Sequence, residues 1–193
     1  MRKRLQFYKP VDPFVIQKNL LEWKTASGQK GWLRYLSLIE DLETLNVWRA
    51  DPGVRSNMDG KPDEVYTIKQ YQTFLSSSTM QVHIMGYSNI PVCIMKSILA
   101  QASPWSLRLP CLPEDGILEF MFRDFARSTL GLTEALTRFV KYYLSFQPYS
   151  RLGIPIPAFD FQNIRLVEDA GFQMNDRITF EGREYGIYRY PNG

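Results

Sequence analysis

The chain has few of the side chains that build metal centres or disulfides. Its 193 residues include one histidine, His83, and two cysteines, Cys93 and Cys111. Neither cysteine has a histidine or a second cysteine at metal-ligand spacing. The sequence therefore predicts neither a zinc site nor a disulfide framework, and no metal cofactor is expected.

Long apolar runs are also lacking. The best run, residues 90–100, is interrupted by Lys96 and falls short of the roughly 18 apolar residues that a membrane span needs. The basic residues 2–4 are followed by polar positions rather than by an apolar stretch, unlike a secretory signal. We therefore expect a cytoplasmic protein with no membrane partner.

Excess charge is small as well. The chain has 23 Lys and Arg against 20 Asp and Glu, a net charge of +3, whereas a nucleic-acid binder usually carries a denser basic stripe. Hydrophobic residues make up 45% and charged residues 22%, close to the averages of globular proteins. The length suits one globular domain. We expect no nucleic-acid partner, and a monomer or a homodimer.

The first part of the chain differs in composition from the rest. Residues 9–13 are turn-like, residues 14–23 are compatible with a short helix, and residues 25–31 form a polar, Gly- and Ser-containing segment. We predict an N-terminal extension and linker over residues 1–31, followed by the main domain over residues 32–193.

The main domain alternates strand and helix patterns. Ser37 and Glu40 have the spacing of a capping box at the start of a helix that reaches about Ala50. Apolar periodicity and turn signals predict the other elements. These are strands at 32–36, 80–84, 91–99, 116–122, 151–156, 172–180 and 185–190, helices from 67, 129 and 160, and an irregular loop at 103–113.

This order predicts a mixed sheet with helices on both faces. The strand, helix and strand between residues 116 and 156 have to form a right-handed parallel crossover. The N-terminus of its helix, near Ser128, offers exposed amides to which a phosphate could bind.

Two segments make the sequence recognisable. Residues 160–172 are similar to an Asn-led helix ending in an acidic-x-x-Gly-Phe turn, and residues 33–54 carry Trp48, Asp51-Pro52 and Val54. With the element order, these residues resemble the GNAT superfamily of acyl-CoA-dependent N-acyltransferases over about residues 32–190. The resemblance implies a single α/β domain with a mixed, mostly antiparallel twisted sheet, a central parallel strand pair and helices on both faces.

The resemblance is nearest to the siderophore-biosynthesis branch, which contains N-hydroxylysine acetyltransferases. It implies acetyl-CoA as cosubstrate and a small-molecule amine or N-hydroxyamine as acceptor. The pantetheine of CoA would pair with the strand amides, and its pyrophosphate would lie in the loop before the long helix. The cofactor-binding residues implied are Phe120, Met121, Phe122, Arg127, Ser128, Thr129, Leu130, Gly131, Leu132, Asp160 and Asn163.

Two residues are candidates for proton transfer. Glu119 is the only carboxylate inside the strand at residues 116–122, and many GNAT enzymes have a general base on this strand. His83 has a side chain that can titrate near neutrality. The alternative for each is a structural role, as a paired glutamate or a packed histidine.

The sequence also departs from the siderophore branch. Leu118 stands where that branch has a histidine, and Pro155-Ile156-Pro157 stands where it has Glu-Pro-Asp. The function that the resemblance implies is transfer of an acetyl or other acyl group from acyl-CoA to a nitrogen. A catalytically silent GNAT-like module that binds acyl-CoA or a partner, and a protein N-terminal acetyltransferase, remain as alternatives.

Overall fold

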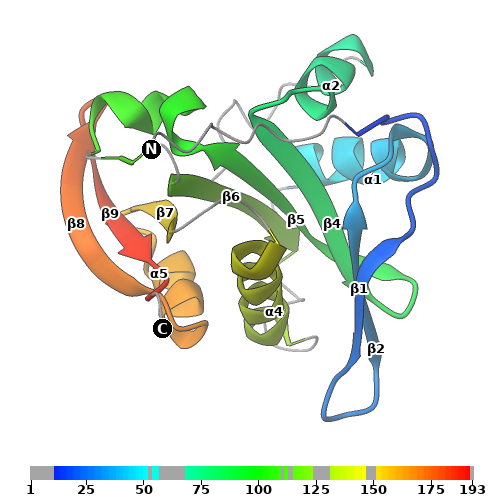
Figure 1. The fold of residues 1–193 in the computed structure, drawn as a ribbon. Coiled ribbons are helices and arrows are strands. Elements are labelled where there is room, and N and C mark those ends of the chain that lie inside the picture. Colours follow the sequence, from blue (N-terminus) through cyan, green and yellow to red (C-terminus); the bar gives the residue numbers. More distant parts are fainter. Residues whose placement is uncertain are drawn as a thin grey trace, which may run out of the picture. The chain divides into compact units, whose positions relative to one another are not determined.

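The structure, a computed structural model, describes residues 11–51, 54–56, 68–109, 111–112, 115–123, 131–146 and 151–191 (Figure 1). Contacts divide these residues into two compact units. One unit contains residues 97–119 and 133–191, and the other contains residues 11–96 and 120–132 as far as they are described.

The strands form a mixed, mostly antiparallel sheet in the order β1-β2-β4-β5-β6-β7-β9-β8, with β3 paired to β6. The strands are β1 (Asn19–Lys24), β2 (Lys30–Tyr35), β3 (Val54–Ser56), β4 (Met80–Tyr87), β5 (Ile90–Leu99), β6 (Asp115–Arg123), β7 (Arg151–Pro157), β8 (Gln173–Phe180) and β9 (Arg183–Arg189). Only β6 and β7 are parallel among the described pairs. The predicted sheet with one central parallel pair is confirmed.

The helices follow the predicted order. They are α1 (Leu38–Ala50), α2 (Ile68–Leu75), α4 (Leu132–Phe146) and α5 (Phe161–Asp169), with 3-10 turns η1 (Ala100–Ala102) and η2 (Pro104–Leu107) in the proline-containing loop. The described residues contain no helix that is both long and apolar enough to cross a membrane.

The start of α1 is capped differently from the prediction. The expected capping box used Glu40, but the Ser37 backbone N–H donates to the carboxylate of Asp41 at 2.8 Å. Asp41 rather than Glu40 occupies this capping position, because the Asp41 carboxylate also accepts two hydrogen bonds from the Arg34 guanidinium at the end of β2. Glu40 lies 3.6 Å from Arg34 and takes the outer place in the same cluster.

The helix predicted over residues 14–23 is wrong, because residues 19–24 form strand β1. β1 pairs with β2 in an antiparallel hairpin, and residues 25–29 form its turn rather than a linker, with Gly28 at φ 82°. A short apolar segment fits either helix or strand, and burial of Trp23 against Tyr87 decides for the strand. The domain boundary after residue 31 stays a prediction.

Two tryptophans of β1 and β2 lie over glycines of the neighbouring strand. Trp23 pairs with Gly31, and a Cβ added at Gly31 would lie 2.1 Å from the indole. Trp32 pairs with Gly86, where a Cβ would lie 2.4 Å from the indole. Each ring covers the strand surface that the glycine leaves bare, as aromatic residues do for glycines in sheets.

Each unit has its own apolar cluster. In the unit with α1 and α2, the buried cluster consists of Leu36, Leu38, Leu45, Trp48, Tyr71, Leu75, Ile84, Ile94 and Met121. In the other unit, Ala100, Trp105, Leu109, Ile117 and Ile187 are buried together. The ring of Trp105 lies 4.6 Å from that of Phe180 and 4.8 Å from that of Tyr185, so the loop with η1 and η2 packs on β8 and β9.

The last part of the chain follows its sequence signals. Asp160 caps α5 by accepting a hydrogen bond from the Asn163 N–H, and Gly171 ends the helix in the left-handed region at φ 97°. Glu181 and Gly182 form the predicted turn between β8 and β9, at the red end of the chain in Figure 1.

Candidate functional site

The parallel ladder between β6 and β7 is short. It contains three pairs, from Asp115 with Arg151 to Ile117 with Gly153, and no later pair occurs in the described residues. β6 nevertheless continues to Arg123 and β7 to Pro157. The two strands thus stop pairing halfway along, and Pro155 and Pro157 have no N–H with which to continue the ladder.

Glu119 lies two residues beyond the end of this ladder and is completely buried. Side chains alternate along a strand, so Glu119 shares a face of β6 with Ile117. Ile117 packs with Trp105 of η2. The carboxylate therefore belongs to the face of the strand on which the proline-containing loop packs, and a buried carboxylate requires polar partners or a use.

His83 is the second predicted proton-transfer residue. It lies on β4, opposite Tyr35 of β2, with its ring 4.7 Å from the Tyr35 ring. Complete burial lowers the pKa of His83 from 6.5 to about 3, so the imidazole is neutral at physiological pH. A base with this pKa is too weak to take a proton efficiently from a substrate near neutral pH. The catalytic role of His83 stays a prediction that its low pKa disfavours.

Phe120, Met121 and Phe122 were expected to bind CoA. All three side chains are buried, and the rings of Phe120 and Phe122 are 5.7 Å apart. Their side chains are thus part of the protein interior, and the main chain of Met121 and Phe122 pairs with β3 along one edge of the strand. A main-chain contact of these residues with CoA stays a prediction.

The predicted phosphate loop is described only at its end. Arg127, Ser128, Thr129 and Leu130 lie outside the described residues. Gly131 has φ 63°, a conformation that favours glycine, and its carbonyl accepts a hydrogen bond from the Tyr87 hydroxyl at 2.9 Å. Leu132 is buried at the first turn of α4. This hydrogen bond therefore fixes the end of the loop to the end of β4.

Asp160 and Asn163 were the remaining candidates for cofactor binding. One Asp160 oxygen accepts from the Asn163 backbone and the other from its side-chain amide, at 3.1 and 2.7 Å. These bonds give both residues a capping role at α5. The buried Oδ1 of Asn163 has no donor among the described residues. A contact of this pair with CoA stays a prediction.

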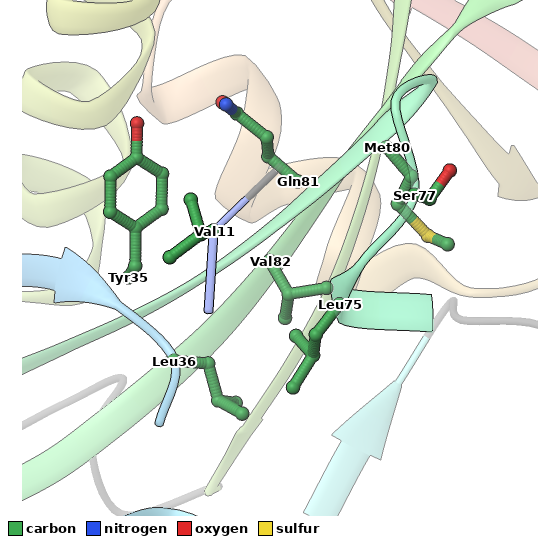
Figure 2. A pocket seen from close by; sticks show the side chains of 8 residues that line it. All are labelled: Val11, Tyr35, Leu36, Leu75, Ser77, Met80, Gln81 and Val82. Atoms are coloured by element: carbon green, nitrogen blue, oxygen red, sulfur yellow. The ribbon is translucent and has the colours of Figure 1, made fainter. Parts of the chain in front are cut away.

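A pocket that the sequence did not indicate lies at the end of β2 and the start of β4 (Figure 2). It is lined by Val11, Tyr35, Leu36, Leu75, Ser77, Met80, Gln81 and Val82. The pKa of the Tyr35 phenol is raised, chiefly by burial, and a hydrogen bond from Gln81 opposes this shift. The lining has no charged side chain and can bind neutral groups but offers no acid or base near pH 7.

The described residues contain no group of three or more side chains that could hold a metal ion.

No model of a known protein family matches this sequence, and no curated protein matches it. Solved structures do match. An uncharacterized protein from Bacillus halodurans is 13% identical, with a TM-score of 0.73 over 88% of this chain and 89% of that chain. The enzyme AAC(6′)-Ib in complex with ribostamycin and coenzyme A is 16% identical, with a TM-score of 0.68 over 83% and 92%.

The GNAT domain of S. lividans PAT is 12% identical, with a TM-score of 0.61 over 90% of this chain and 96% of that chain. Similarity at this low identity defines the fold. The chain has the GNAT fold. It shares this fold with the aminoglycoside acetyltransferase AAC(6′)-Ib, whose structure was solved in complex with coenzyme A.

Proposed function

We propose that the protein is an acyl-CoA-dependent N-acyltransferase that moves an acetyl group to a nitrogen of a small molecule. One observation carries this proposal: the β6–β7 ladder ends after three pairs, and the buried carboxylate of Glu119 follows directly on β6. An extended ligand can pair with a strand edge where a ladder has ended. The GNAT fold and its CoA-bound representatives support the same assignment.

In this proposal the pantetheine arm of acetyl-CoA pairs with the main chain of residues 120–122, whose side chains are buried. The pyrophosphate binds the loop from Arg127 to Leu132, in which the left-handed Gly131 allows close approach of the backbone. The amides at the start of α4 and the Arg127 guanidinium supply the positive field for the phosphates.

The proposed reaction is direct transfer. The lone pair of a neutral acceptor nitrogen attacks the thioester carbonyl carbon, the C–N bond forms and the C–S bond breaks. Glu119 accepts the proton that the nitrogen loses, and CoA leaves as a thiolate that takes up a proton from solvent, to which Glu119 later releases its own. Holding the two reactants together contributes to the rate in addition to base catalysis.

The sequence resemblance favours an N-hydroxylated amine in siderophore biosynthesis as the acceptor. A hydroxylamine nitrogen is largely neutral at pH 7, so its acylation depends less on a base than that of a primary ammonium group. Among the similar structures, an aminoglycoside acetyltransferase and a spermidine N-acetyltransferase chimera act on amines. A primary amine is therefore the second candidate, and Glu119 would matter more for it.

Calorimetry with acetyl-CoA tests the cosubstrate, and a thiol-release assay over N-hydroxyamines and primary amines tests the acceptor. Binding of acetyl-CoA with turnover of one acceptor class supports the proposal. Binding without turnover of any acceptor would favour the silent module that binds acyl-CoA. Absence of acetyl-CoA binding would contradict both of these and leave the partner-binding module.

A further inference from the structure

A second pocket lies in the unit that contains residues 97–119 and 133–191, where β6, β7 and β9 run side by side. Its lining includes Cys111, Asp115, Ile117, Arg151, Gly153 and Arg189. The pocket is small, with room for little more than one water-sized group, and it is partly open to solvent. It therefore fits one functional group of a ligand rather than a whole ligand.

The floor of this pocket is formed by a row of three residues in register. Ile117 of β6 pairs with Gly153 of β7, and Gly153 pairs with Arg189 of β9. Residues in register point to the same face of a sheet, so Ile117 and Arg189 flank a position without a side chain. A Cβ at Gly153 would lie 3.7 Å from its nearest neighbour, an ordinary contact, so packing alone does not require this glycine.

The two arginines of the pocket differ in their partners. Arg151 donates Nε and Nη2 to the Asp115 carboxylate at 2.8 and 2.6 Å, and Asp115 also accepts from the Leu112 N–H. These bonds hold the Arg151 guanidinium in place. Arg189 is half-buried and has no acidic partner in the part of the chain that the structure describes. Among the lining residues that the structure describes, two arginines and one aspartate leave one positive charge in excess.

Cys111 adds a thiol to this pocket. Its pKa is raised, first by burial and next by the Asp115 charge, while Arg189 and Arg151 act in the opposite direction. The thiol therefore stays protonated at neutral pH. It contributes a weak hydrogen-bond donor and no negative charge that would compete with a bound anion.

We propose that this pocket binds an oxyanion, a carboxylate or phosphate group held by Arg189 and the fixed Arg151. Arginine matches the planar geometry of carboxylate and phosphate oxygens, and a bound anion would balance the excess positive charge. The proposal does not depend on the acyl transfer proposed above, although Ile117 of this pocket shares a face of β6 with Glu119. The oxyanion is either a free small ion or one end of a larger molecule that extends into solvent.

Cys111 makes occupancy of the pocket measurable. Alkylation by iodoacetamide, followed for each cysteine by peptide mass spectrometry, reports on Cys111, while the fully buried Cys93 reports on unfolding. Acetate or inorganic phosphate, at a concentration roughly ten times the dissociation constant of that anion, should slow the alkylation of Cys111 about tenfold. Sodium chloride at the same ionic strength controls for screening. The melting temperature, which should rise with the same anions, gives a second readout.

Arg189→Gln should abolish both the protection and the shift in melting temperature. Arg183→Gln, on an exposed position of the same strand, should retain both. Equal protection by chloride, or protection that persists in Arg189→Gln, would overturn the proposal. If Cys93 becomes alkylated in Arg189→Gln, that variant is unfolded, and Gly153→Ala is the variant to use instead. The added methyl group would lie at an ordinary contact distance from its neighbours and would make the pocket smaller, so it should weaken the protection of Cys111 by the anion.

The two sources of the oxyanion are separated by ligand length. If the natural occupant is a free ion, acetate and N-acetylglycine should protect at similar concentrations. If it is one end of a larger molecule, N-acetylglycine should protect at a clearly lower concentration than acetate. Failure of both carboxylates and of phosphate to protect Cys111 or to raise the melting temperature would overturn the site itself and leave the acyl-transfer proposal untouched.

Discussion

Arg34 and Asp41 form a bidentate ion pair, with nitrogen to oxygen distances of 2.6 and 2.8 Å, between the end of β2 and the first turn of α1. The Asp41 side chain is 2% exposed and that of Arg34 is 11% exposed. The same carboxylate caps α1 through the Ser37 N–H. One side chain thus fixes the turn from strand to helix and neutralises a half-buried cation.

Asp41→Ala should destabilise the protein by about 2 to 3 kcal/mol, because it removes the cap of α1 and both short hydrogen bonds of the half-buried Arg34 guanidinium, which keeps only the more distant Glu40 carboxylate. Urea denaturation measures the loss. Glu43→Ala, on an exposed position of the same helix, is the control and should change stability by no more than about 0.5 kcal/mol. The double variant Arg34→Met with Asp41→Leu should be less damaging than Asp41→Ala, and an equal or greater loss would contradict this account.

Glu119→Gln should lower turnover by about 10²- to 10⁴-fold while the affinity for acetyl-CoA stays level. The amide keeps the shape of the side chain and removes the proton acceptor. Turnover and melting temperature are to be measured on the same preparation. A structural glutamate would give the reverse result, with lower stability and nearly unchanged turnover per folded molecule.

Arg127→Glu should weaken acetyl-CoA binding, because it replaces the proposed pyrophosphate ligand with a carboxylate of the same charge sign as the phosphates. Isothermal titration calorimetry measures the affinity. Arg165→Glu makes the same charge change at an exposed position of α5 and serves as the control. Equal affinities of wild type and Arg127→Glu would show that the assigned loop is wrong.

Trp23→Ala should cost about 3 to 5 kcal/mol, as expected for truncation of a buried tryptophan. Ile16→Ala, on a side chain that is 66% exposed, should be nearly neutral.

A chain that begins at Lys30 would lose the whole of β1 and the hydrogen bond from the Leu38 N–H to the Pro13 carbonyl. We expect it to be insoluble or to melt without cooperativity, and a stable, cooperatively folded product would support the predicted boundary after residue 31.

His83 should make stability depend on pH. Its folded pKa of about 3 lies below the ordinary value of 6.5, so between these values the unfolded chain binds a proton that the folded chain does not. Its contribution is therefore complete above pH 6.5 and is lost, at up to about 1.4 kcal/mol per pH unit, as the pH falls toward 3. In His83→Phe the slope of stability between about pH 4 and 6.5 should become smaller, as measured by urea denaturation at each pH. An unchanged slope would show that His83 is not its source.

Local signals were enough to predict much of the fold. Apolar spacing predicted α1 and the β4–β5 hairpin, and apolar spacing with the Asp160 cap predicted α5. Each of these elements depends on residues that are close together in the chain. The β6–α4–β7 crossover followed from element order. β1 could not be predicted in this way, since it becomes a strand through burial of Trp23 against a residue far along the chain. β3 has three residues and no periodicity.

The candidate site was predictable only in part. Glu119 could be selected from the sequence as the carboxylate of its strand, but its complete burial and the face it shares with Ile117 required the structure. The oxyanion pocket gave no sequence signal. Gly153 and Arg189 are separated in the chain, and only the register of β6, β7 and β9 brings them together.

The tryptophans that cover Gly31 and Gly86 have an evolutionary consequence. Any side chain at position 31 would occupy the space of the Trp23 indole, and the same holds for position 86 and Trp32. A mutation of either glycine alone therefore meets a filled site. Loss of Trp23 first would open room for a side chain at position 31, whereas position 86 also faces the Ile90 carbonyl oxygen at 2.4 Å and would stay closed. Relatives of this chain should therefore lose the ring of Trp23 before they change Gly31, and should keep Gly86 whatever residue stands at position 32.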